Sequence, residues 1–256
     1  MRTKYNLPEE QYLNDGIPVV YGSEIILNDN RNFDDSNERR KFINKVYLIL
    51  SFQLLITGVF IGLCNQVKEI SNFMISYTGI QLSSLSLLFV LISSCSLYCC
   101  YDRIKMKPYN WIYLILFTIS MTYLMGFIGI SYKTNILLLG GLITSFIFIS
   151  LTIYSWQTKI DYTIYGNILV TLLCGLILFG FIFSFFNFPM INIIYSVIGS
   201  VLFSFYIIYD TQLIVGGNHR SIQFETNDFV IASISLYLDI INLFLFMLDI
   251  IGGRNN

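Results

Sequence analysis

The sequence predicts an all-α polytopic membrane protein with seven transmembrane helices. The 256-residue chain is 55% hydrophobic and only 12% charged, whereas a soluble domain carries about 25% charged residues. Seven apolar stretches each come near the roughly 20 residues that a helix needs to cross a bilayer. The formal net charge of −1 gives no indication of nucleic-acid binding, so we expect the membrane, and not a nucleic acid, as the partner.

The apolar stretches divide the chain into a tail and a membrane domain. Residues 1–38 are polar and lack helical periodicity, so we expect a disordered cytosolic tail. Residues 39–253 form the expected seven-helix transmembrane domain. Its expected spans are residues 44–65, 75–101, 110–131, 135–157, 163–187, 190–216 and 229–251. Pro108 and Pro189 stand at or just ahead of the first turn of a span, where a missing N–H does no harm.

The distribution of lysine and arginine predicts the orientation in the membrane, because cytoplasmic flanks carry more of both. With a cytosolic N-terminus, ten of the basic residues that flank the spans fall inside and three outside. The inside residues are Arg31, Arg39, Arg40, Lys41, Lys45, Arg103, Lys105, Lys107, Lys159 and Arg220, and the outside residues are Lys68, Lys133 and Arg254. Seven spans then place the C-terminus in the lumen, whereas a count of six would place it inside.

Motifs for enzymatic chemistry are missing from the sequence. There is no Walker sequence, no GxGxxG before a helix and no HExxH. The five cysteines match no zinc-binding spacing, and the single histidine excludes a histidine-based metal site. We therefore expect neither an enzyme nor a resident cofactor.

Two aspartates stand in the middle of long apolar runs. They are Asp210, in "IIYDTQLI", and Asp239, in "SLYLDIINLFLF". An ionised carboxylate near the bilayer centre costs about 3 kcal/mol on insertion scales, and such residues usually face a bundle interior and mark an ion or proton path. Asp210 and Asp239 are therefore the leading candidates for function.

Both aspartates belong to stripes with a spacing of three and four residues, which places each stripe on one helical face. In the last span the stripe is Asp228, Ala232, Ser235, Asp239, Asn242, Phe246 and Asp249. In the sixth span it is Asn192, Ser196, Gly199, Phe203, Tyr206 and Asp210. Such stripes also occur where membrane helices pack through small and polar residues. Tyr206, Ser235, Asn242 and Asp228 are thus pore-lining or helix-seam candidates.

The two aspartates lie at similar depths. Asp210 lies about six residues before the inner end of its span, and Asp239 lies about ten residues into the next span. At ~1.5 Å per residue, their depths in the membrane differ by about 6 Å. Two carboxylates in one low-dielectric site cannot both ionise cheaply, so the pair would share a proton and sense pH. Their oxygens also suit a transient Ca²⁺ ion. Arg103, at the inner end of the second span, lies at about the depth of Asp210 and is a candidate for its competing counter-charge.

Several stretches resemble one known family. They are "RRKFINKVYLILSFQLLIT" (39–57), "PYNWIYLILFTISMTYLMG" (108–126), "WQTKIDYT" (156–163), "YSVIGSVLFSFYIIYDTQLIVGG" (195–217) and "ASISLYLDIINLFLFMLDIIG" (232–252). Together they resemble the transmembrane Bax inhibitor motif family, in particular its Lifeguard branch. The resemblance implies six helices packed around a central C-terminal helix. It also implies a calcium leak that an aspartate pair and protonation govern, with Asp210 and Asp239 as the pair and Arg103 as the arginine.

The resulting hypothesis is a pH-modulated calcium leak channel that regulates calcium homeostasis and cell death. The resemblance implies an internal membrane, the endoplasmic reticulum or the Golgi. Two alternatives stay open: a non-catalytic scaffold that binds cell-death regulators or other channels, and a Ca²⁺/H⁺ exchanger. The tail has only Pro8 and Pro18, so it lacks the proline-rich composition of Lifeguard tails.

Overall fold

The structure is a computed structural model that describes residues 22–99, 101–104, 106, 108–183, 185, 189–217 and 220–252. The chain divides into two compact units, Met1–Lys41 and Phe42–Asn256. The second unit holds nearly all of the apolar sequence and both of the aspartates singled out above.

All of the regular structure in the described residues is helical, so the predicted all-α class is confirmed. The elements in chain order are α1 (Gly22–Gln66), α2 (Lys68–Ile75), α3 (Tyr77–Cys99), α4 (Tyr101–Ile104), α5 (Tyr109–Gly129), α6 (Thr134–Gln157), the 3₁₀ turn η1 (Thr163–Tyr165), α7 (Gly166–Phe183), α8 (Pro189–Val215) and α9 (Phe229–Gly252).

Seven of these helices are long and apolar enough to cross a membrane, as the sequence predicted. Their candidate spans are Asn37–Gln66, Tyr77–Leu97, Tyr109–Gly129, Thr134–Gln157, Thr163–Ile182, Ile191–Val215 and Phe229–Gly252. The short α2 and α4 occupy connectors on either side of α3. The described chain is therefore a bundle of membrane-length helices joined by short segments.

The expected disordered tail differs in part from the structure. Residues 1–21 lie outside the described residues, whereas α1 begins at Gly22 and continues into the first span. A polar segment without apolar periodicity can extend an existing helix, because each added residue gains a hydrogen bond without a new nucleation step. The absence of periodicity over residues 22–38 was therefore not sufficient to exclude a helix.

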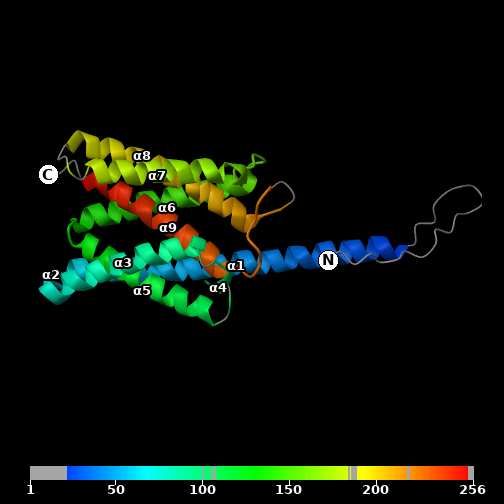
Figure 1. Cartoon of the computed structure of the whole chain (residues 1–256), viewed down its shortest axis with the longest axis horizontal. Coiled ribbons are helices and arrows are strands. Elements are labelled where there is room, and N and C mark those ends of the chain that lie inside the picture. Colours follow the sequence, from blue (N-terminus) through cyan, green and yellow to red (C-terminus); the bar gives the residue numbers. More distant parts are fainter. Residues whose placement is uncertain are drawn as a thin grey trace, which may run out of the picture. The chain divides into compact units, whose positions relative to one another are not determined.

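The C-terminal helix α9 is the central helix of the bundle. In an 18-residue stretch of its candidate span 67% of the residues are buried, compared with 11% in such a stretch of the span that contains α7. Within the unit Phe42–Asn256, α9 runs between α6 and α8 on one side and α1 and α5 on the other (Figure 1). The predicted arrangement around a central C-terminal helix agrees with this packing.

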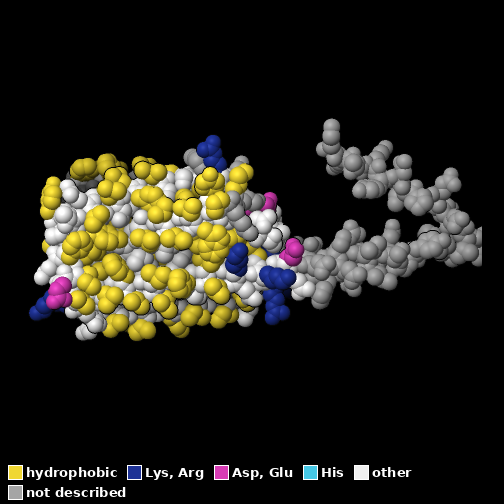
Figure 2. All heavy atoms as spheres, turned by 90° about the horizontal axis from the view of Figure 1, so that it is seen from below, with side chains coloured by type: hydrophobic (Ala, Val, Ile, Leu, Met, Phe, Trp, Pro, Cys, Tyr) yellow, Lys and Arg dark blue, Asp and Glu magenta, His cyan; other side chains and the backbone are white. Residues whose placement is uncertain are grey.

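The outer surface of the bundle is apolar. Large hydrophobic side chains such as Leu48, Leu142 and Phe146 are exposed. Figure 2 shows such side chains covering most of the visible face of the bundle, with charged side chains toward its ends. This distribution suits helices that face lipid along their length and water at their ends.

Helices α8 and α9 approach closely at a glycine. A Cβ atom added at Gly199 of α8 would meet the Phe246 ring of α9 at 2.4 Å. That ring is itself packed between Tyr195 and Phe203, with centroid separations of 5.7 and 5.8 Å. The ring therefore cannot move aside without disturbing two further aromatic contacts.

We predict that Gly199→Ala destabilises the bundle by about 1–3 kcal/mol, the usual cost of overpacking a core. The measurement is the free energy of unfolding in mixed detergent micelles. The control is Gly175→Ala in α7, where an added Cβ meets nothing within 4 Å. We expect the control to stabilise by up to about 1 kcal/mol, because alanine is the better helix former. Equal stability of the two variants would contradict the proposed close approach.

Candidate functional site: a buried carboxyl pair

Two carboxyl groups meet inside the membrane-spanning part of the bundle. Asp210 lies on α8, five residues before that helix ends at Val215, and Asp239 lies on α9, ten residues after it begins at Phe229. Their exposed fractions are 6% and 5%. The two side chains lie within hydrogen-bonding reach of each other. The structure therefore brings together the two aspartates that the sequence singled out.

The two polar stripes predicted from the sequence face each other. Gly199 and Phe203 of the α8 stripe both pack against Phe246 of the α9 stripe. Farther along the same antiparallel seam, Asp210 of the first stripe meets Asp239 of the second. The small glycine at one contact and the large phenylalanine opposite it let the helices approach closely. This seam sets the register that places one carboxyl group against the other.

Among the described residues, no cation acts on either aspartate of the pair. Helices α5, α6 and α7 carry no charged residue, and Asp210 is the only charged residue of α8. A hydrogen bond between two carboxyl groups requires that one of them holds a proton. Two neighbouring carboxylates without a cation would be strongly unfavourable in a low-dielectric interior. The arrangement is therefore suited to one shared proton or to a bound cation.

Cation binding by the pair stays a prediction. Oδ2 of Asp239 is buried and has no hydrogen-bond partner among the described residues. The same residues contain no group of three or more His, Cys, Asp or Glu side chains that could hold a metal ion. Two carboxylates alone are too few for a resident Ca²⁺ ion, which takes six to eight oxygen ligands. They suit at most the transient Ca²⁺ contact expected from the sequence.

The structure does not bring Arg103 to the carboxyl pair. This residue lies on α4, and its side chain is exposed. The interaction that it was expected to make with Asp210 is made by Asp239 instead. An exposed guanidinium keeps its hydration, whereas moving it next to a buried aspartate would cost desolvation free energy. The sequence predicts a depth for Arg103 but not the direction of its side chain.

The other candidates lie along the seam or at its end. Tyr206 is buried on α8 beside Phe203, with a ring-centroid separation of 5.7 Å. Ser235 and Asn242 are half-buried on α9, and Asn242 Nδ2 donates to the Leu238 carbonyl at 2.8 Å. These positions agree equally with pore-lining and seam roles.

Asp228 belongs to the start of α9. Its Oδ2 accepts a hydrogen bond from the Glu225 backbone N–H at 3.2 Å, and its carbonyl accepts one from the Ala232 N–H at 2.9 Å. The residue is also almost fully buried. Asp228 therefore orders the turn that leads into α9, which is a structural role.

A polar network that sequence reasoning missed joins two loops at the end of the bundle where α8 stops and α9 starts. We call it the loop clasp, and it consists of Asp161, Thr163, Gln212, Arg220 and Ser221. Asp161 Oδ2 accepts from the Ser221 N–H at 2.8 Å and from the Ser221 hydroxyl at 2.7 Å. Gln212 Oε1 accepts from the Tyr162 N–H at 2.7 Å.

Arg220 closes the same network by capping α6. Its guanidinium donates to the carbonyls of Ser155, Thr158 and Ile160, at 3.2, 2.9 and 2.5 Å. A cation suits these carbonyls because they stand at the negative end of the α6 dipole. The loop clasp thus ties the α8–α9 loop to the α6–α7 loop, at the adjoining ends of the two helices that carry the aspartates.

The hydrogen bonds of the loop clasp change the pKa of Asp161. Its partial burial acts to raise the pKa, but the bonds from Thr163 and Ser221 outweigh that effect and hold the pKa at about 2. The ionised form is therefore the one that the folded loops favour.

A second buried polar group, also missed from the sequence, lies on the other side of α9. We call it the hydroxyl cluster, and its members are Gln53 and Thr57 of α1, Thr118 and Thr122 of α5, and Tyr237 of α9. Each of the two other helices contributes polar residues four positions apart within an apolar run. That spacing was a usable signal, because it places both residues of a pair on one helical face.

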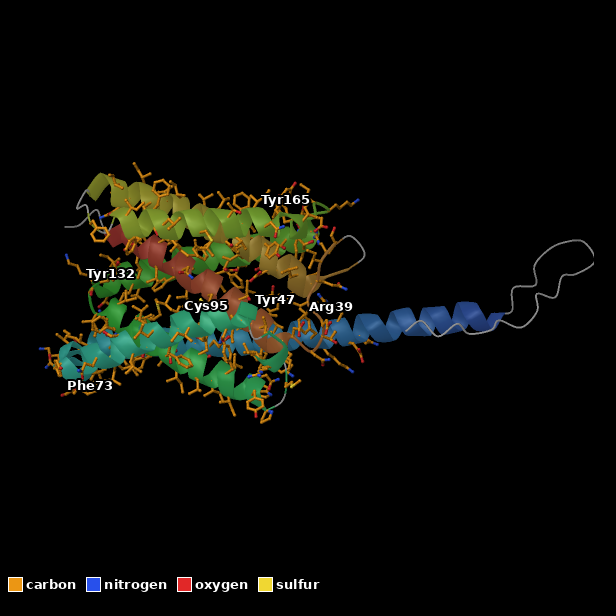
Figure 3. The ribbon with its side chains drawn as sticks, viewed as in Figure 1. Arg39, Tyr47, Phe73, Cys95, Tyr132 and Tyr165 are labelled. Carbon is orange, nitrogen blue, oxygen red and sulfur yellow. The ribbon has the colours of Figure 1, made fainter. Side chains whose placement is uncertain are left out.

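A cluster at the opposite end of the bundle connects the α5–α6 turn to α9. Tyr132, which lies in that turn (Figure 3), donates to Asp249 Oδ1 at 2.6 Å. Burial and the Asp249 carboxylate raise the pKa of Tyr132. Its phenol therefore stays protonated and keeps the bond over the physiological pH range.

Comparison with known proteins gives a consistent result. The family model described as "Inhibitor of apoptosis-promoting Bax1" matches residues 39–256. Protein lifeguard 3 of Homo sapiens is 33% identical over 227 residues, which cover 87% of this chain and 72% of that protein. Protein LIFEGUARD 2 of Arabidopsis thaliana is 33% identical over 218 residues, which cover 83% of this chain and 87% of that protein. The matched residues include the carboxyl pair, the loop clasp and the hydroxyl cluster.

We predict that Asp161→Asn lowers stability in a pH-dependent way. The folded-state pKa of about 2 lies below the ordinary value of 3.8, so the ionised Asp161 stabilises the fold above the ordinary value. That contribution is lost as the pH falls through the folded-state value. The melting temperatures of wild type and variant in detergent should therefore differ at pH 6 and converge near pH 2. Glu69→Gln, at an exposed carboxylate, is the control. A difference that persists unchanged at pH 2 would contradict the prediction.

Proposed function

Because the chain belongs to the Bax inhibitor family, whose model is described as inhibitors of apoptosis-promoting Bax1, we propose that it is a pH-modulated Ca²⁺ leak channel. The proposed location is an intracellular membrane, the endoplasmic reticulum or the Golgi, with a cytosolic N-terminus and a lumenal C-terminus. There it would regulate calcium homeostasis and cell death. The seven membrane-length helices and the family membership support this proposal.

The observation that carries the proposal is the buried contact between Asp210 and Asp239. Ionisable residues within membrane spans are costly, and they are retained where they line an ion or proton pathway. Here two of them meet between α8 and the central helix α9, and no cation among the described residues acts on either. A helix seam built only for packing has no need of a group whose charge depends on pH.

The chemistry of the pair links proton binding to the seam between the helices. With one shared proton, the carboxyl groups hold each other and the seam between α8 and α9 is closed. Without that proton, the two negative charges repel unless a cation lies between them, and carboxylate oxygens are suitable Ca²⁺ ligands. With two protons, the pair has no charge that could attract a cation. Ca²⁺ passage along this seam would therefore depend on pH through these two residues.

Two features limit what the proposal includes. Arg103 has no part in it, because its side chain is exposed and does not contact the pair. The seam residues Tyr206, Ser235 and Asn242 would border the ion path on either side of the pair. Their contribution would be to shape the path, since none of them carries a charge.

We predict that Asp210→Asn combined with Asp239→Asn abolishes the pH dependence of Ca²⁺ flux in proteoliposomes that contain only this protein. Asparagine keeps the size and the hydrogen bonding of the side chain but cannot change its charge. The control is Asp249→Asn, an exposed aspartate of the same helix, which should leave the pH dependence as in the wild type.

The same experiment separates the proposal from its alternatives. A double variant with the pH response of the wild type would show that the pair is not the sensor. The absence of any flux from the wild-type protein would favour the scaffold that binds cell-death regulators. Saturable Ca²⁺ uptake that requires an opposing proton gradient would favour a Ca²⁺/H⁺ exchanger.

A further inference from the structure

We propose that the hydroxyl cluster, through Tyr237, positions α9 so that Asp239 stays against Asp210, and that the pair cannot separate without breaking the Tyr237 contact. This inference rests on the function proposed above, because it names a positioning residue for the same gate. It assigns a role to Tyr237, Thr57 and Thr122, which no part of the channel proposal uses.

The hydroxyl cluster is a continuous chain of hydrogen bonds. Tyr237 Oη lies 2.7 Å from Thr57 Oγ1, which in turn lies 3.0 Å from Thr122 Oγ1. Gln53 Nε2 donates to Thr118 Oγ1 at 2.9 Å. Tyr237 is fully buried, and the exposed fractions of the other four side chains are 8% or less. The cluster is therefore held inside the bundle and away from lipid.

Counting hydrogen atoms fixes the direction of the bonds. Thr57 has one hydroxyl hydrogen, which it donates to the Gln53 carbonyl at 2.9 Å. Tyr237 and Thr122 must then both act as donors to Thr57 Oγ1. The phenol of Tyr237 thus makes a defined bond to α1, and this bond fixes how α9 is turned about its own axis.

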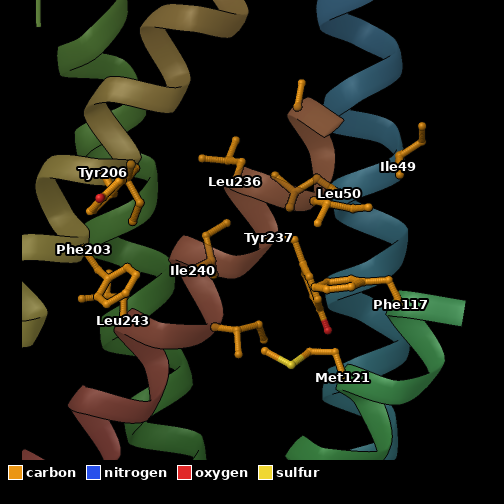
Figure 4. Packing of buried hydrophobic residues seen from close by; sticks show 14 of the residues in the cluster. Ile49, Leu50, Phe117, Met121, Phe203, Tyr206, Leu236, Tyr237, Ile240 and Leu243 are labelled. Atoms are coloured by element: carbon orange, nitrogen blue, oxygen red, sulfur yellow. The ribbon is translucent and has the colours of Figure 1, made fainter. Parts of the chain in front are cut away.

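Tyr237 and Asp239 lie on opposite faces of the central helix. Two residues along an α-helix correspond to a turn of about 200° and a rise of about 3 Å. Figure 4 shows Tyr237 pointing from α9 toward Phe117 and Met121 of α5, and away from Tyr206 of α8. At one depth in the membrane, α9 is therefore held by a hydroxyl on one face and by a carboxyl on the other.

This arrangement couples the two faces mechanically. A rotation or shift of α9 that moves Asp239 away from Asp210 also moves the Tyr237 hydroxyl, which stands at the end of a long side chain. The hydroxyl would then be separated from its acceptor, Thr57 Oγ1 of α1. An unpartnered hydroxyl is costly in a membrane interior. Opening of the carboxyl pair therefore has to include the loss of the Tyr237–Thr57 bond.

Among the described residues, the aspartate pair is the only pH-sensitive contact of α9 at this depth. The titratable groups of neighbouring elements that face α9 are Asp210, Tyr206 and Tyr195 of α8, Lys45 of α1 near Phe229, and Tyr132 in the α5–α6 turn near Asp249. Only Asp210 acts on Asp239. Tyr237 is therefore a positioning residue, and the proton is bound by the aspartates.

Two variants test this role by Ca²⁺ flux. Tyr237→Phe keeps the ring and removes the hydroxyl. In a protein that leaks, we expect the Ca²⁺ flux at the pH where the wild type leaks least to rise about 3-fold to 20-fold, which is the range for the loss of one intramembrane hydrogen bond. Tyr113→Phe removes a half-buried hydroxyl that bonds to Ser93 and Ser96 of α3, and should leave flux and its pH profile unchanged. Unchanged flux for Tyr237→Phe in a leaking protein overturns the inference.

A second readout does not depend on flux. Unfolding in mixed micelles is measured for Tyr237→Phe, for Asp239→Asn and for the double variant. If the two faces of α9 are coupled, the combined change in the unfolding equilibrium constant departs from the product of the single changes by more than about twofold, whereas independent sites agree within that factor. Agreement within twofold overturns the inference, whether or not the protein conducts Ca²⁺.

The two readouts keep the inference separate from the channel proposal. If the wild-type protein shows no flux, the channel proposal fails and the double-mutant cycle alone decides the positioning role. If Tyr237→Phe does not fold, Thr57→Val and Thr57→Ser replace it. The valine variant loses the acceptor of the Tyr237 hydroxyl and should show the coupling, whereas the serine variant retains this acceptor and should behave as the wild type.

Discussion

The contact between Asp210 and Asp239 is the interaction on which the rest of the structure depends. Two carboxyl groups can lie together in a membrane interior only where lipid is excluded and where a proton or a cation compensates their charge. Close packing of α8 on α9, with Gly199 against Phe246, provides the first condition. Because α5, α6 and α7 carry no charged residue, the compensating charge has to come from a mobile ion. A proton or a cation is therefore needed wherever the two carboxyl groups lie together.

The central position of α9 follows from polar contacts on two of its faces. Asp239 interacts with α8, and Tyr237 interacts with α1 through Thr57. In a membrane the hydrophobic effect does not distinguish helix contacts from lipid contacts, so packing and hydrogen bonds decide which helices associate. The helix with the most such contacts becomes the most buried one. Asp239 and Tyr237 both oppose a rotation of α9, because that rotation would break their contacts.

The loop clasp extends this arrangement to the membrane surface. Asp161 and Arg220 bind the α8–α9 loop to the α6–α7 loop, and Gln212 continues the network into α8, two residues beyond Asp210. The adjoining ends of α8 and α9, the two helices that carry the aspartates, are thus fixed to the neighbouring loop. Because all three polar groups lie within residues 39–256, they belong to the part of the chain that matches the family.

The sequence by itself determined the class, the seven membrane-length helices and the two aspartates on stripes at similar depth. Hydropathy and periodicity are properties of neighbouring residues, so they can be read without a fold. Only the tertiary structure decided that the two stripes meet, that Arg103 stays exposed, and that Tyr237 bonds to Thr57, 180 residues away. Pairing between distant segments depends on how each helix is rotated in the bundle, and local sequence does not specify that rotation.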